Sequence, residues 1–264
     1  MDPDRLKEMS VGFVRGSGAP IPSRPSLVMI HGAGGCGRLW QGQVRLMEDS
    51  VNAVALDLPG HGGTAGKVPQ TLEGYALWLS DVLAAAFPDP VFLMGHSMGG
   101  GIVLETALAD PRRVRGLILA GTGPVLSVSP AFFEGFNTRF EETVDRLVGY
   151  GYGPGADSEM IREGARLMKS AGRETVIADF RACDRFDRRK DLDRLRLPCL
   201  IVCGEKDRLT PPALSRSLHE AIRGSRLALL PGVGHFAMIE APRAFSRRVR
   251  EFILSVSSPS GSSV

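Results

Sequence analysis

Cysteine is scarce in this sequence, with four in 264 residues. Cys199 and Cys203 fall in one apolar stretch, where they would share a face of a strand, while Cys36 and Cys183 lie far from them in sequence. Four scattered cysteines are too few for the disulfide framework of a small secreted protein. We therefore expect reduced thiols and a cytoplasmic protein.

Other recognisable signals are missing as well. No apolar run is long enough to cross a bilayer, and residues 1–8 are charged, so we expect no transmembrane segment and no signal peptide. No His-Glu-x-x-His or Cys-x-x-Cys pattern suggests a metal site. The net charge is only +3, with 32 basic and 29 acidic residues, which offers no basic surface for nucleic acid.

What the sequence does contain is enough apolar material for a large core, since 43% of its residues are hydrophobic. The length suits one domain with an insertion or two small domains. Apolar strand-like runs alternate with helical patterns, which predicts a mostly parallel sheet covered on both faces. The predicted strands are 11–14, 26–30, 51–56, 91–94, 114–120, 199–203 and 226–230, and predicted helices include 71–87, 102–109 and 241–254.

The alternation stops between residues 124 and 196, where the sequence predicts helices without strands, including 131–148 and 158–170 with a Gly-rich loop at 149–155. Inserted after a strand, this block would cover the site as a lid, and some of its apolar side chains would line a pocket. Its apolar surface would serve equally well as a homodimer contact. We expect most of its large apolar residues to be core: Phe132, Phe133, Phe136, Phe140, Met160, Met168 and Phe180.

The pentapeptide Gly95-His96-Ser97-Met98-Gly99 lies between a predicted strand and a predicted helix. A sharp turn from strand to helix holds the central residue in a strained conformation, and glycines on either side let the two elements approach closely. Ser97 would stand at the tip of this turn. The backbone N–H of Met98 would face the same space at the helix start, where negative charge is favoured. One turn thus supplies a candidate nucleophile and half of an oxyanion hole.

A second glycine-rich segment allows two interpretations. Gly32, Gly34 and Gly37 match the dinucleotide pattern Gly-x-Gly-x-x-Gly after a strand, and Asp57 stands about where that pattern has its ribose-binding acid. A nicotinamide or flavin oxidoreductase is therefore a rival hypothesis. Alternatively, the loop presents a backbone N–H, that of Ala33, as the second oxyanion donor.

Two titratable residues follow later strands. Asp207 comes after strand 199–203 and His235 after strand 226–230, at the strand ends where active sites of parallel sheets gather. If Asp207 is not part of an active site, it is a turn or capping residue before the helix that begins near Pro211. Among the remaining candidates, we expect His219 to be exposed on a helix. We expect the others to be structural or to fix loops through hydrogen bonds: His31, His61, His96 and Asp57.

The order Ser97, Asp207, His235 resembles the α/β-hydrolase superfamily, in which nucleophile, acid and base follow one another in this order. The resemblance covers nearly the whole chain. It implies an eight-stranded, mostly parallel sheet with helices on both faces, a core of residues 1–123 and 197–256, a helical cap at 124–196 and a disordered tail at 257–264. It rests on the joint occurrence of His31-Gly32-Ala33-Gly34-Gly35, Asp57-Leu58-Pro59-Gly60-His61-Gly62, Gly95-His96-Ser97-Met98-Gly99-Gly100, Gly204-Glu205-Lys206-Asp207 and Gly234-His235-Phe236.

The resemblance implies acyl transfer without a cofactor. Ser97 would attack a carbonyl, His235 would take its proton, and Asp207 would hold the imidazole. The amides of Ala33 and Met98 would bind the oxyanion. A serine at the elbow argues against the dehalogenases and epoxide hydrolases of the superfamily, which use a carboxylate.

The bond that is cleaved stays open at this stage. The first hypothesis for the substrate is a small-molecule carboxylic ester of small to medium acyl length. Alternatively, the same three residues would cleave thioesters, lactones or carbon–carbon bonds. A ligand receptor that keeps the pocket without turnover is a hypothesis from another class. The sequence departs from many relatives at Cys36, where they carry serine, and the thiol there would either line the pocket or be inert.

Overall fold

The computed structural model describes residues 1–257, so residues 258–264 of the tail predicted at 257–264 lie outside the described residues. Ser257, predicted to begin that tail, is the last residue of helix α11. The strands are β1 (Phe13–Arg15), β2 (Ser26–Ile30), β3 (Asn52–Leu56), β4 (Val91–His96), β5 (Val114–Ala120), β6 (Cys199–Gly204) and β7 (Arg226–Leu230). The helices are α1 (Pro3–Glu8), α2 (Gln41–Met47), α3 (Leu72–Ala86), α4 (Met98–Ala109), α5 (Pro130–Thr138), α6 (Phe140–Gly151), α7 (Ser158–Ser170), α8 (Arg173–Asp184), α9 (Pro212–Ala221), α10 (Ala237–Glu240) and α11 (Pro242–Ser257), with short 3-10 helices η1 (Gly37–Trp40), η2 (Pro111–Arg113) and η3 (Leu192–Arg194).

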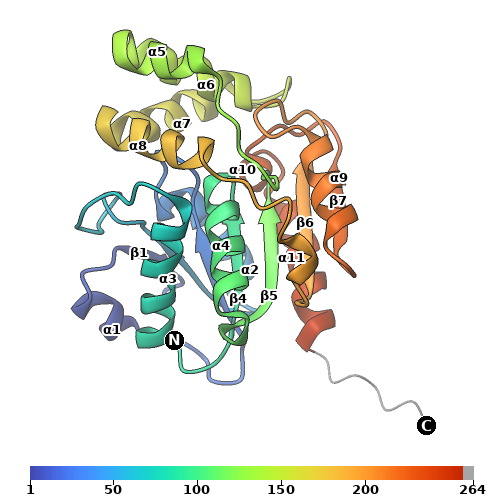
Figure 1. The fold of residues 1–264 in the computed structure, drawn as a ribbon. Helices are drawn as coiled ribbons and strands as arrows, with labels where there is room; N and C mark the ends of the chain where they lie inside the picture. The colour runs from blue at the N-terminus through green and yellow to red at the C-terminus, as the bar shows by residue number, and fades with distance from the viewer. Residues whose placement is uncertain (258–264) are drawn as a thin grey trace.

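The strands form one sheet in the order β1-β3-β2-β4-β5-β6-β7 (Figure 1). All neighbours are parallel except β1, which pairs antiparallel with β3. The described chain therefore has seven strands, and the expected eight was wrong. The segment between β1 and β2 holds Pro20, Pro22 and Pro25. Proline lacks a backbone donor, so this stretch is poorly suited to a further strand.

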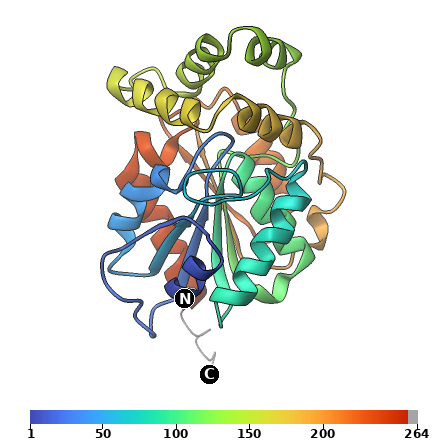
Figure 2. The same ribbon diagram turned by 90° about the vertical axis from the view of Figure 1, so that its left-hand side faces the viewer.

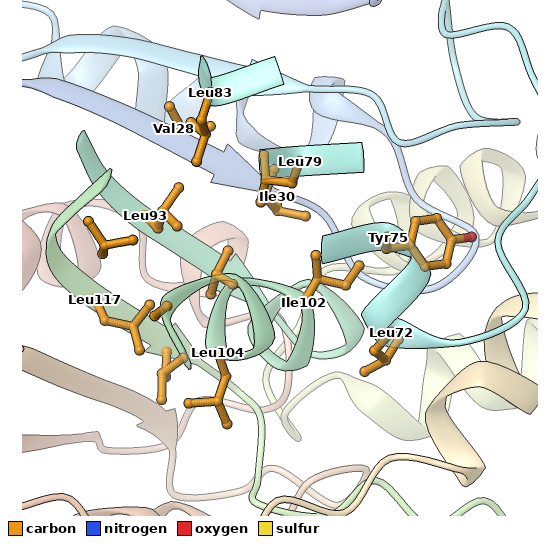
Figure 3. Close-up of a cluster of buried hydrophobic side chains, with 14 of the residues drawn as sticks. Val28, Ile30, Leu72, Tyr75, Leu79, Leu83, Leu93, Ile102, Leu104 and Leu117 are labelled. Atoms are coloured by element: carbon orange, nitrogen blue, oxygen red, sulfur yellow. The ribbon is translucent and has the colours of Figure 1, made fainter. Parts of the chain in front are cut away.

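Helices cover both faces of the sheet (Figures 1 and 2). On one face, residues of α1, α3, α4 and α9 share a buried cluster with the strands, and on the other face residues of α2, α10 and α11 do so. Helix α3 begins where the Oγ1 of Thr71 accepts a hydrogen bond from the N–H of Gly74 at 3.2 Å. Its apolar residues recur at helical spacing and belong to one buried cluster with residues of the sheet and of α4 (Figure 3): Leu72, Tyr75, Leu79 and Leu83.

Four helices, α5 to α8, are inserted between β5 and β6 and lie over the end of the sheet at which the parallel strands finish (Figures 1 and 2). The predicted helix 131–148 is in fact two helices, because Arg139 has non-helical dihedrals of φ −143° and ψ 61°. The predicted loop at 149–155 begins only after Gly151, where α6 ends. An isolated antiparallel bridge joins Val125 to Asp187 at the base of the inserted segment.

The strand order contains a switch point beside β2. Strand β3 lies on one side of β2 and β4 on the other, so the connections after β2 and after β4 diverge. Open parallel sheets form a crevice at such a point, outside the carboxyl ends of the strands. The loop that starts at His31 and the turn at Ser97 meet there, below the inserted helices. Within residues 1–257, no helix combines the length and apolar character needed to cross a membrane.

Candidate active site

Ser97 stands at the sharp turn from β4 into α4. Its dihedrals are φ 54° and ψ −119°, a conformation that costs roughly 1–3 kcal/mol for a residue with a side chain. Glycine is required on both sides. A Cβ at Gly95 would lie 2.1 Å from the carbonyl oxygen of Gly99, and a Cβ at Gly99 would lie 2.5 Å from the carbonyl oxygen of His31. The predicted turn is therefore present, and Ser97 is half-buried.

Asp207 and His235 follow β6 and β7 and meet behind this turn. The Nδ1 of His235 donates to the Oδ2 of Asp207 at 2.9 Å, and both side chains are buried. The Oδ1 of Asp207 accepts backbone N–H bonds from Leu209 and Thr210, each at 2.9 Å. Burial opposes ionisation of Asp207, but the charge and hydrogen bond of His235 and the hydrogen bonds from Thr210 outweigh it, so the pKa of Asp207 is lowered. Asp207 therefore both fixes the turn that follows β6 and contacts His235.

The loop after β2 approaches Ser97 closely. A Cβ at Gly32 would lie 3.2 Å from the Cβ of Ser97, so only glycine fits without displacement. The next residue, Ala33, lines the same pocket as Ser97. Among residues 1–257, the backbone N–H groups of Ala33 and Met98 have no hydrogen-bond acceptor. Unpaired donors beside a serine are suited to binding an oxyanion.

A pocket opens between the sheet and the inserted helices, and Ser97 and His235 both line it. Phe132 from α5, Met168 from α7 and Phe180 from α8 contribute to its walls, as expected for some of the apolar residues of this segment. Phe136 and Phe140 instead belong to the buried core. No aspartate, glutamate, lysine or arginine lines the pocket within the described chain. The space beside Ser97 is therefore suited to neutral, largely apolar groups.

Comparison with known proteins identifies the family of the chain. The family model described as "Alpha/beta hydrolase family" matches residues 27–248. The chain belongs to the α/β hydrolase family. The resemblance read from the sequence is confirmed, and the protein is a hydrolase of the esterase type.

Individual relatives of this hydrolase have related activities. It is 29% identical over 249 residues to a pimeloyl-[acyl-carrier protein] methyl ester esterase of Aeromonas hydrophila, covering 87% of this chain and 95% of the relative. It is also 29% identical over 248 residues to a putative carbamate hydrolase, RutD, of Cronobacter turicensis, covering 88% and 92%. A solved structure of a thermophilic esterase superposes with a TM-score of 0.81 at 26% identity, covering 94% of this chain and 98% of that one.

The residues that match the dinucleotide pattern have a structural role in this hydrolase. Asp57 accepts the N–H of Gly37 at 2.6 Å and the N–H of Gly63 at 2.8 Å, so both carboxylate oxygens hold backbone turns. The glycine-rich loop leads into the short helix η1 and not into a long crossover helix. The oxidoreductase hypothesis is therefore dropped. Within residues 1–257, no group of histidine, cysteine and acidic side chains could hold a metal ion.

The other histidines fix loops, as expected. His31 donates from Nδ1 to the carbonyl of Gly32 at 2.9 Å and accepts the N–H of Leu58 at Nε2, 3.1 Å away. A ring that donates once and accepts once is neutral. Burial and the neighbouring His61 lower the pKa of His31 to about 3, in agreement. His219 is exposed on α9 and contacts Ser225.

Cys36 is buried and is not among the residues that line the pocket. Burial raises the pKa of its thiol. Of the two alternatives left by the sequence, the pocket-lining one is wrong. All four cysteines are free and buried.

Sequence reasoning missed two residues of the site. Thr210 donates from Oγ1 to Oδ2 of Asp207 at 2.8 Å and lies 3.1 Å from Nδ1 of His235. Its position three residues after Asp207 in a turn was the available signal. The second is Asp179, on α8, which is fully buried and bonds the loop that carries Ala33 through the N–H of Gly34. No local pattern marks Asp179, because its partners are distant in sequence.

Proposed function

We propose that this hydrolase cleaves neutral carboxylic esters of small to medium acyl length through a covalent intermediate on Ser97. The observation that carries the proposal is the 2.9 Å hydrogen bond between His235 and Asp207, in a pocket wall that also contains Ser97. Acyl transfer needs a nucleophile, a base and an acid that orients the base. The hydrogen bond pairs the proposed base with the proposed acid, and Ser97 lines the same pocket as the base. The strained turn at Ser97 supports the same role, because it places this residue between β4 and α4 in the wall of the pocket.

Each proposed residue has one task. The Oγ of Ser97 attacks the ester carbonyl carbon while Nε2 of His235 takes the hydroxyl proton. Asp207 keeps the other ring nitrogen protonated and stabilises the imidazolium. The N–H groups of Ala33 and Met98 bind the oxyanion, and His235 then gives its proton to the departing alcohol. Water, deprotonated by His235, attacks the acyl carbonyl and releases the carboxylic acid and Ser97.

The pocket wall supports a neutral substrate. A charged acyl or alcohol group would lose its hydration there without meeting an opposite charge, at a cost of several kcal/mol. The relative from Aeromonas hydrophila is named for a methyl ester, and an ester group carries no charge. We propose that helices α5 to α8 act as the lid over this pocket, because Phe132, Met168 and Phe180 contribute to its walls.

The test is hydrolysis of p-nitrophenyl esters from acetate to palmitate by the wild type and by Ser97→Ala. The variant should lose at least about 10³-fold in kcat and keep its fold, since removing a triad serine leaves only binding and the oxyanion hole. Its melting temperature should not fall, because the side chain is half-buried at the pocket wall and removing the hydroxyl leaves no large cavity. An active Ser97→Ala protein would rule out the mechanism. If neither ester hydrolysis nor labelling by a fluorophosphonate is seen, the ligand-receptor hypothesis gains support.

A further inference from the structure

Asp179 connects the inserted helices to three separate parts of the sheet domain. It lies on α8, and its side chain is fully buried. Its Oδ2 accepts the backbone N–H of Gly34 at 2.8 Å and a bond from Nε2 of His61 at 2.9 Å, and its Oδ1 accepts the hydroxyl of Tyr75 at 2.5 Å. None of these contacts takes part in the acyl transfer proposed above. A buried carboxylate with partners from three elements needs an explanation of its own.

The hydrogen bonds also assign the charges in this cluster. The Nδ1 of His61 lies 3.1 Å from the carbonyl of Pro59, which can only accept, and its Nε2 faces the carboxylate of Asp179. Both ring nitrogens therefore donate, which makes His61 an imidazolium paired with Asp179. An anionic Asp179 accepts the N–H of Gly34 as a charge-assisted bond, which is stronger than one to a neutral oxygen.

The bond to Gly34 acts on one peptide group. The N–H of Gly35 bonds the carbonyl of Gly32 at 3.0 Å and closes a four-residue turn. Gly34, at the third position, has φ +62°, which a type II turn requires. Type I and type II turns differ in the direction of their central peptide, here the one that joins Ala33 to Gly34. In the observed direction its N–H points at Asp179, whereas a flip would turn the carbonyl oxygen of Ala33 against the carboxylate.

We propose that Asp179 is a positioning residue that holds the loop of the oxyanion hole in its working conformation from the inserted helices. The inference rests on the proposed function, in which Ala33 is an oxyanion donor. Packing acts in the same direction as the hydrogen bond. A Cβ at Gly34 would lie 2.8 Å from Met168 of α7 and 3.1 Å from Val176 of α8, so these helices press directly on the turn. The inserted helices therefore contact the turn that carries Ala33 through both a hydrogen bond and side-chain packing.

The test compares Asp179→Ala with Asp179→Asn and with a matched control. Glu105 is also a buried carboxylate that joins the sheet domain to the inserted segment, through a 2.6 Å contact with Arg188, and it lies on α4 away from the turn. Asp179→Ala should lower kcat about 10²-fold with KM within about threefold, the range for loss of one oxyanion donor. Asp179→Asn, which keeps an acceptor for Gly34, should recover most of kcat. Glu105→Ala should lower the melting temperature and leave kcat within about threefold.

A second readout reports on the oxyanion hole itself. A trifluoromethyl ketone forms a tetrahedral adduct with the serine, so its Ki should rise in Asp179→Ala by the same factor by which kcat/KM falls. If Asp179→Ala does not fold, Asp179→Ser keeps the site polar and serves as the breaking variant. Unchanged kcat in the folded breaking variant, or an equal loss of kcat in Glu105→Ala, would overturn the inference. Failure of the proposed function is separate, because it would appear as ester hydrolysis that survives Ser97→Ala.

Discussion

The Nε2 of His96 donates a hydrogen bond to the backbone carbonyl of His235, 3.0 Å away, and the two rings lie 4.5 Å apart between centroids. His96 directly precedes Ser97 and is buried. Burial and the neighbouring His235 lower the pKa of His96 to about 3, so its ring is neutral at any working pH. One side chain thus links the turn at Ser97 to the loop of the proposed base.

This link predicts a kinetic effect. His96→Phe keeps a ring of similar shape but removes the donor, so the loop at His235 is less well fixed. A net hydrogen bond contributes about 1 kcal/mol, and kcat should fall roughly 5- to 10-fold. Steady-state kinetics on p-nitrophenyl butyrate would measure this, with Phe92→Leu, a core change away from the pocket, as the control. Unchanged kcat in His96→Phe would show that the bond does not orient the base.

Thr210 should matter in the same way for Asp207. Thr210→Val retains the volume and removes the hydroxyl that donates to Oδ2 of Asp207. Hydrogen bonds to charged groups contribute about 1.5–3 kcal/mol, so we expect a loss of roughly tenfold or more in kcat. Thr210→Ser keeps the hydroxyl and should retain most of the activity. Equal rates for the valine and serine variants would contradict the assignment.

The pair of His61 and Asp179 predicts a pH dependence of stability. Burial alone would lower the pKa of His61, but the hydrogen bond and charge of Asp179 outweigh it and raise the pKa above 6.5, with smaller contributions from Pro59 and Asp57. The neighbouring His31 is neutral, and Tyr75 remains protonated because burial and Asp179 raise its pKa.

A raised pKa means that folding favours the protonated ring. The stabilisation is complete below pH about 6.5, the unfolded value, and is lost as the pH rises through the higher folded value. The melting temperature of the wild type should therefore exceed that of His61→Gln most clearly near pH 6, and the difference should shrink toward pH 9. Calorimetry at a series of pH values measures it. A difference that stays constant over this range would mean that His61 is not charged in the folded protein.

The uncharged pocket wall predicts selectivity against acids. Mono-p-nitrophenyl succinate carries a carboxylate at the end of its acyl group, whereas its methyl ester is neutral and almost the same size. Burial of an unpaired carboxylate costs at least about 3 kcal/mol, so kcat/KM for the acid should be at least about 100-fold lower. The methyl ester should react about as fast as the butyrate. Fast hydrolysis of the acid would indicate a cationic side chain near the pocket, outside the set of residues that line it.

Local sequence was sufficient for most of the fold and for the candidate residues. The turn at Ser97 depends on glycines within two residues of it, and the strand ends before Asp207 and His235 are marked by apolar runs. Such patterns act over a few residues, so they can be read without knowing the rest of the chain. Boundaries were less accurate, since Arg139 divides a predicted helix. The strand count implied by the resemblance was also wrong, because the described chain has seven strands and not eight.

Tertiary structure alone decided how these parts are joined. The partners of Asp179 lie 145, 118 and 104 residues away in the chain, and Thr210 reaches His235 across 25 residues. Which apolar residues of α5 to α8 line the pocket, and which fill the core, likewise followed from packing. The sequence by itself determined the strained serine turn and the positions of Asp207 and His235 after their strands, because each depends on neighbouring backbone. It did not determine the hydrogen bond between Asp179 and the loop at Gly34, because a buried carboxylate meets its donors only when distant elements come together.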